Sequence, residues 1–158
     1  MSESNSESSS PVKFGVTVGA FVLLLMGGLI YLFVRPDDSA LFLAFLPSFP
    51  KITDSYQLRQ QLGWAPSLIH VIAFSWLTWV TAGCRAPVLI ALLWTSVNII
   101  FELSQLLPFD QLPKGFSIFS GTFDVADIMA SFSGGVLAVI TLRAISRATL
   151  QGGNRNEQ

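Results

Sequence analysis

The sequence is poor in cysteine and in charged residues. It has a single cysteine, Cys84, among 158 residues, which excludes an intrachain disulfide and a metal cage built from cysteines. Only 12% of the residues are charged and the net charge is −1, so no basic surface is available to bind a nucleic acid. Hydrophobic residues make up 51% of the chain, more than the core of a small globular domain could hide. A lipid bilayer is therefore the expected solvent.

Four apolar segments predict four membrane-spanning helices. Residues 14–34 form an uninterrupted apolar run, long enough to cross a hydrocarbon layer of about 30 Å. The run is too long, and its flanks are unsuitable, for a cleaved signal peptide. Three more segments follow, at 67–82, 86–107 and 123–145. We expect an all-α fold, a four-helix transmembrane bundle that occupies residues 14–145.

The segments between and beyond these helices are more polar or broken by proline. Residues 1–13 are rich in serine and glutamate and predict a disordered N-terminal tail. Residues 35–66 form a long connection, whose apolar stretch at 41–50 is too short to span and contains prolines. We expect it to be a partly ordered outer loop between the first and second helices. Residues 146–158 form a polar C-terminal tail.

Polar side chains that are costly in hydrocarbon occur inside or at the ends of these spans. They are His70, Glu102, Asp124 and Asp127, and a charged residue at mid-helix costs roughly 2.5–3.5 kcal/mol on insertion scales. Because successive helices alternate in direction, all four residues fall at the same end of the bundle. This convergence predicts a polar site within the membrane.

The spacing of the polar residues places them on defined helix faces. Asn98, Glu102 and Gln105 are separated by four and three residues and share one face of the third predicted helix. Asp124 and Asp127 begin a stripe on the fourth predicted helix. This stripe continues in small residues that allow close helix packing, namely Ser131, Gly134 and Ala138. We expect the polar face of the third helix to lie against this stripe.

Each of these polar residues also has a purely structural interpretation. Asp124 can cap the N-terminus of its helix, and Asp127 can gain from the helix dipole. Glu102 can form a structural hydrogen bond, and His70 can be a packed polar residue. The residues lack a recognised metal-ligand spacing, so we predict no metal or cofactor. No motif indicates a named class of enzyme.

The order of three short motifs resembles that of the VanZ-like family of small bacterial membrane proteins. The motifs are His70 to Phe74 (HVIAF), the E-x-x-Q pattern that ends in Gln105, and the D-x-x-D pattern that ends in Asp127. The resemblance covers about residues 65–140. It implies a multi-pass protein of the bacterial inner membrane, in a family sometimes associated with resistance to glycopeptide antibiotics such as teicoplanin.

The sequence departs from the family pattern at two positions near the fourth helix. Gly121 stands where the family has an arginine, and Ser131 stands where it has an asparagine, whereas Gly134 matches the family glycine. Arginine is a natural anchor for phosphate or carboxylate. Its loss leaves the predicted site net acidic and argues against an anionic ligand.

The preferred function is binding or modulation of an envelope lipid, an amphiphile or a cation through a polar pocket in the outer half of the bundle. The partners would be membrane lipids, and an oligomer or a larger complex is compatible with this interpretation. The pocket candidates are His70, Glu102, Gln105, Asp124, Asp127, Asn98 and Ser131.

Two alternatives to this function remain open. The first is an intramembrane enzyme that acts on a lipid head group, with His70 as acid or base and Glu102 or Asp127 as the partner carboxylate. The second is a structural subunit of a larger membrane complex, in which the polar residues only hold the helices together.

The distribution of basic residues predicts the orientation of the bundle. An even number of spans places both termini on one side. That side carries Lys13, Arg85, Arg143, Arg147 and Arg155, against Arg35, Lys51, Arg59 and Lys114 on the other. The excess favours cytoplasmic termini. A topology reporter fused after Gln158 should therefore report the cytoplasm, and one inserted near Gln60 the periplasm; the opposite pattern would overturn the orientation.

Overall fold

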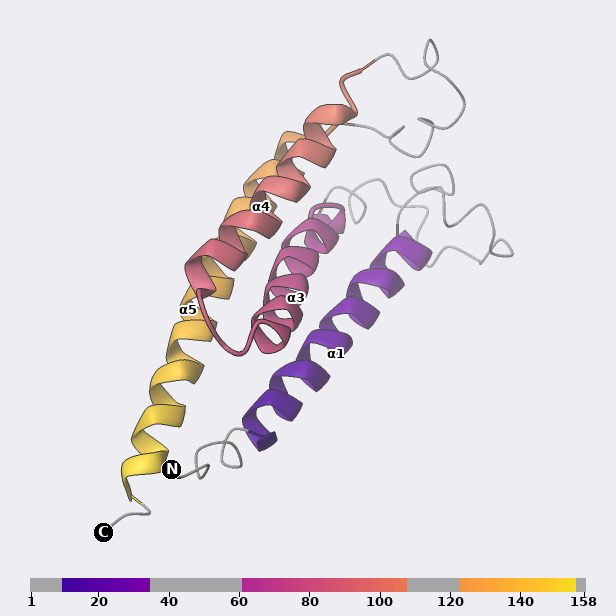
Figure 1. Cartoon of the computed structure of the whole chain (residues 1–158). Coiled ribbons are helices and arrows are strands. Elements are labelled where there is room, and N and C mark those ends of the chain that lie inside the picture. The colour runs from indigo at the N-terminus through magenta and orange to yellow at the C-terminus, as the bar shows by residue number, and fades with distance from the viewer. Residues whose placement is uncertain (1–9, 35–60, 108–122, 156–158) are drawn as a thin grey trace.

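The computed structural model describes residues 10–34, 61–107 and 123–155, and in these ranges the chain forms four helices and no strand. The helices are α1 (Ser10–Val34), α3 (Ala65–Thr81), α4 (Pro87–Ser104) and α5 (Val125–Arg155) (Figure 1). Three of them, α1, α4 and α5, are long and apolar enough to cross a membrane, whereas α3 is a shorter apolar helix of 17 residues. The predicted all-α bundle is confirmed.

The helix ends differ most from the predicted spans in three places. α1 begins at Ser10, inside the segment predicted as a disordered tail, because Pro11 fits the first turn of a helix. α5 continues to Arg155, through much of the predicted polar tail, because a helix that leaves the hydrocarbon need not end there. α4 ends at Ser104, before the predicted limit at residue 107. Residues 35–60 of the predicted outer loop at 35–66 and most of the N-terminal tail lie outside the described residues, and α3 begins at Ala65, so it includes the last two residues of that predicted loop.

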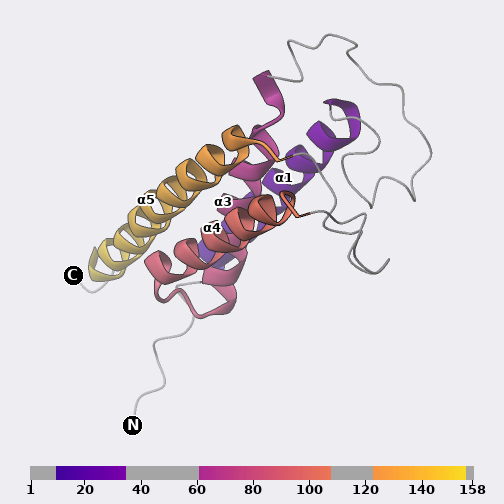
Figure 2. The ribbon, with the colours of Figure 1, turned by 90° about the horizontal axis from the view of Figure 1, so that it is seen from above.

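Helix α3 lies at the centre of the bundle. It packs against α1 on one side and against α4 and α5 on the other, and α4 and α5 also pack against each other (Figures 1 and 2). The four helices alternate in direction along the chain, so α1 starts and α5 ends at the same end of the bundle (Figure 1). We call this end the terminal end, and we call the opposite end, where α3 and α5 begin, the acidic end.

Small residues of α5 allow α3 to approach closely. A Cβ atom on Gly134 would lie 2.7 Å from the carbonyl oxygen of Leu68 and 3.2 Å from the Cβ of Val71. Ser131 and Ala138, on the same stripe, are fully buried. The stripe predicted from the sequence is therefore a packing surface, but it faces α3 rather than α4. The physical reason is that α3, the shorter helix, lies between α1 and α5 and needs close contact on both sides.

A core cluster near the terminal end holds all four helices together. It contains one buried residue from each helix: Val16, Trp79, Ile90 and Leu142. The other large apolar side chains of α1, α4 and α5 are mostly exposed on the outside of the bundle, as shown by Phe14 at 72%. An apolar exterior around a small core is the distribution expected for helices surrounded by lipid.

The turn from α3 to α4 is short, and the residue that follows the end of α3 has left-handed backbone angles. The N–H of Cys84 bonds the carbonyl of Trp79 at 2.8 Å, and the N–H of Gly83 bonds that of Val80 at 3.2 Å. These two bonds form a Schellman motif, in which glycine occupies the left-handed position. Gly83 has φ +71°, and Cys84 and Ala86 have positive φ as well. The turn thus reverses the chain within five residues at the terminal end.

The close contact at Gly134 predicts a specific sensitivity to substitution. Gly134→Ala places a methyl group against the backbone of α3, which cannot move without separating the helices, and should destabilise the bundle by about 1–3 kcal/mol. Gly28→Ala is the matched control, because nothing lies within 4 Å of a Cβ there. Unfolding of the purified protein in mixed micelles would measure both; equal effects would contradict the packing described.

Candidate functional site

The acidic end contains two buried carboxyl groups from different helices. Asp127, in the first turn of α5, is fully buried, and Glu102, near the end of α4, is 5% exposed. Thr95 of α4 lies against Gly135 of α5. Glu102 is seven residues beyond Thr95, and Asp127 is eight residues before Gly135. Because α4 and α5 are antiparallel (Figure 1), this register places the two carboxyl groups at the same depth.

The Asp127 carboxyl group is tied to helix α3. The hydroxyl of Ser67, itself buried, donates a hydrogen bond of 2.9 Å to Oδ1 of Asp127. Ser67 lies in the first turn of α3 and Asp127 in the first turn of α5. Two helix N-termini, with their partial positive charge, therefore flank this carboxyl group. The arrangement compensates in part for the cost of burying it.

Asp124 has the capping role that the sequence allowed. Its Oδ1 accepts a hydrogen bond of 2.8 Å from the backbone N–H of Ala126, and its side chain is exposed. It precedes Val125, the first residue of α5. Asp124 thus satisfies one of the N–H groups that every helix start leaves without an intrahelical partner.

The remaining predicted residues of α4 and α5 lie near the two carboxyl groups but bond mainly to their own helices. Asn98 donates a hydrogen bond of 3.0 Å to the carbonyl of Trp94. The N–H of Gln105 bonds the carbonyl of Glu102 at 3.1 Å, and the Gln105 side chain is half-buried. Ser131 donates a bond of 2.9 Å to the carbonyl of Asp127. These bonds fix the end of α4 and the start of α5.

His70 packs against helix α1. Its ring stacks on Tyr31 with centroids 5.9 Å apart and an interplanar angle of 16°, and it also contacts the ring of Phe74. A Cβ atom on Gly27 would lie 3.2 Å from Nε2 of His70. Gly27 thus provides the space for the imidazole. The sequence motif that pairs His70 with Phe74 is in this structure the centre of an aromatic contact between α3 and α1.

Sequence reasoning missed two contributors to this end of the bundle. Ser67 carries the hydroxyl that binds Asp127, and Tyr31 supplies the ring beside His70. The available signal for Ser67 was its position, one helical turn before His70 on the same helix. Tyr31 is the only tyrosine of the apolar run 14–34. It lies near the end of that run, which the predicted topology places at the same depth as His70.

The charges of the described residues are separated between the two ends. Glu102, Asp124 and Asp127 lie at the acidic end, whereas Lys13, Arg85, Arg143 and Arg147 lie at the terminal end. Within the described ranges, no group of three histidine, cysteine or acidic residues is arranged to hold a metal ion. Chemically, the acidic end offers two carboxyl groups and a hydroxyl, which suit a positively charged or hydrogen-bond-donating group.

No family model, no curated protein and no solved structure matches this sequence.

The hydrogen bond between Ser67 and Asp127 predicts energetic coupling between α3 and α5. In a double-mutant cycle with Ser67→Ala and Asp127→Ala, in which each substitution removes one partner of the bond, the coupling free energy should be about 0.5–3 kcal/mol, the range typical of contacting residues. The cycle formed by Ser133→Ala and Asp127→Ala is the control, because Ser133 is exposed and donates to the Met129 carbonyl of its own helix. Unfolding measurements on the six proteins give both couplings, and a zero value for the first would show that the bond contributes nothing.

Proposed function

We propose that this protein is a VanZ-like protein of the bacterial inner membrane that binds a positively charged ligand at the acidic end. The single observation that supports this proposal is the burial of Glu102 and Asp127 at one depth on neighbouring helices. Carboxyl groups in a membrane are costly, and membrane proteins retain them mainly for function. Ligands of the required chemistry are a cation, a cationic amphiphile or an amine-bearing head group of an envelope lipid.

The sign of the ligand follows from the charges around the site. Each of the ionisable groups that the structure describes at the acidic end is an acid, apart from His70. Gly121 stands where the resembling family has an arginine, so the usual anchor for phosphate or carboxylate is missing. Two acidic groups at one depth favour a positively charged partner over an anionic one.

The charge separation also supports an orientation. The terminal end carries Lys13, Arg85, Arg143 and Arg147, and short basic segments are retained on the cytoplasmic side. Both termini would then be cytoplasmic, and the acidic end would lie in the outer half of the membrane. A ligand would reach the site from the envelope side.

A structural role is the second candidate, and the Ser67–Asp127 bond favours it. Asp127 bonds across to α3 and Asp124 caps the start of α5, which supports a structural role for two of the three acids. A protein of this kind would present its helices to a larger complex. Ligand binding and the structural role differ in what they require of Glu102. Ligand binding requires its negative charge on α4, whereas the structural role of Asp127 and Asp124 does not.

The charge of Glu102 provides the test. Glu102→Gln keeps the shape and hydrogen-bonding capacity of the side chain, and should weaken binding of a cationic amphiphile about tenfold, the loss expected for a charge-assisted hydrogen bond. Binding of a long-chain primary alkylammonium to the purified protein, whose N–H groups can donate to the carboxylate, is compared with that of its neutral alcohol analogue, and this comparison isolates the charge.

Asp124→Asn is the matched control for this experiment. It removes an acidic charge at the same end but retains a capping side chain, and should leave the affinity nearly unchanged. Equal binding by wild-type protein and Glu102→Gln would reject the ligand site and leave the structural role. Equal losses in both variants would indicate a general surface charge effect instead.

A further inference from the structure

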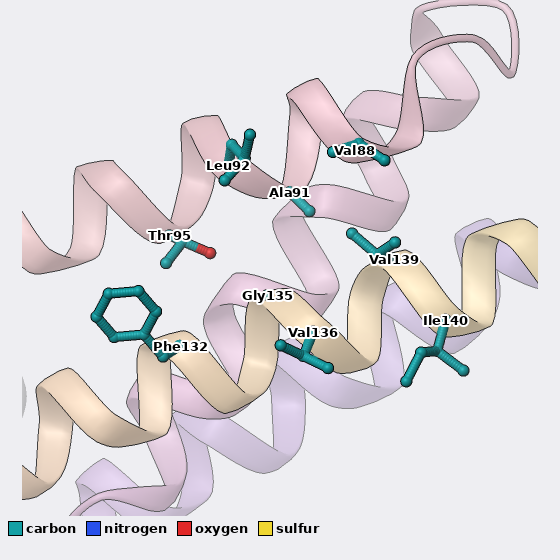
Figure 3. A pocket seen from close by; sticks show the side chains of 9 residues that line it. All are labelled: Val88, Ala91, Leu92, Thr95, Phe132, Gly135, Val136, Val139 and Ile140. Atoms are coloured by element: carbon teal, nitrogen blue, oxygen red, sulfur yellow. The ribbon is translucent and has the colours of Figure 1, made fainter.

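An apolar groove lies between α4 and α5, away from the acidic site. Its volume is about 250 Å³. Figure 3 shows its lining, with Val88 of α4 opposite Val139 of α5. The lining residues are Val88, Ala91, Leu92, Thr95, Phe132, Gly135, Val136, Val139 and Ile140.

The groove is open to the exterior of the bundle and almost entirely hydrocarbon-lined. Leu92, Val136 and Ile140 each expose more than half of their surface. Thr95 is the one polar residue of the lining, and its hydroxyl has no hydrogen bond among the residues described. On a membrane-facing surface such a groove will be filled by hydrocarbon, because water gains no polar partners there.

A basic residue continues the groove toward the terminal end. Arg143 follows Ile140 by three residues and Val139 by four, so it lies on the same face of α5, one turn beyond the groove. Arg143 is exposed. Since Val139 is opposite Val88 and the two helices are antiparallel, Arg143, four residues beyond Val139, is level with the turn that precedes α4. The apolar span of α4 begins at Pro87, so a lipid head group would lie against α4 at about this level.

The start of α4 adds a second positive feature at the same place. Its N-cap residue, Ala86, makes no side-chain cap, and Pro87 occupies the first turn. The first intrahelical bond runs from Ile90 to Ala86, so the N–H groups of Val88 and Leu89 precede it and carry the positive end of the helix dipole. Arg85, exposed in the preceding turn, adds a guanidinium group.

We propose that this groove and its basic mouth bind an anionic glycerophospholipid. One acyl chain would lie along the groove, and the phosphate would be held by Arg143, Arg85 and the start of α4. Charge complementarity identifies this occupant: the groove fits a hydrocarbon chain, and its mouth is cationic where a head-group phosphate lies. Basic pockets between transmembrane helices recognise such head groups. The site is at the opposite end of the bundle from Glu102 and does not depend on the proposed function.

The relative association of two spin-labelled lipids with the full-length protein tests this site. Wild-type protein reconstituted in phosphatidylcholine should prefer labelled phosphatidylglycerol over labelled phosphatidylcholine. Arg143→Gln should lower that preference about fivefold, the loss expected for one interfacial cation. Lys13→Gln is the control, because Lys13 lies at the same end but on α1, which packs mainly against α3.

A second pair of variants tests the groove without changing charge. Val136→Trp should fill the groove and reduce the association of both lipids, whereas Leu137→Trp, an exposed neighbour that does not line the groove, should not. Soluble glycerol phosphate should fail to displace the bound lipid. The proposal is overturned if Lys13→Gln lowers the preference as much as Arg143→Gln, if Val136→Trp has no effect, or if glycerol phosphate displaces the lipid.

Discussion

The close approach of α5 to the backbone of α3 is the constraint on which the rest of the bundle depends. Because Gly134 lies against the carbonyl of Leu68, the first turns of the two helices come together and Ser67 reaches Asp127. With α5 in this position, the neighbouring residue Gly135 faces α4 and lies against Thr95. Two adjacent glycines thus place α5 against both α3 and α4. The common depth of the Glu102 and Asp127 carboxyl groups follows from this packing.

The bundle is polarised along its axis, and each end has its own chemistry. At the acidic end, two helix starts and a hydrogen bond from Ser67 surround the carboxyl group of Asp127, which lipid would not tolerate alone. At the terminal end, arginine side chains and an uncapped helix start surround a surface suited to anions. An apolar exterior connects the two. Its described acidic residues therefore lie at one end of the bundle and its described basic residues at the other.

Composition and polar spacing were sufficient to predict the four helices, their alternation and the burial of the stripe from Asp127 to Ala138, because hydrophobic length and small-residue spacing are local properties. They were not sufficient to predict the partner of that stripe. The sequence predicted that this stripe would pack against the polar face of residues 98–105. In the structure it packs against α3, where Ser67 bonds Asp127. Likewise, the environment of His70 depends on Gly27 and Tyr31 of a distant helix, which no pattern within α3 reveals.

The central position of α3 has a consequence for how the protein enters the membrane. This helix is the shortest of the four and keeps Ser67 and Ser75 buried among its neighbours. The Ser67 hydroxyl bonds Asp127 of α5, and hydrocarbon would offer it no such partner. α3 therefore depends on α5, which follows it in the chain, to cover this part of its surface. Insertion of α3 is expected to be coupled to insertion of α5, and a chain truncated before α5 would leave that surface of α3 facing lipid.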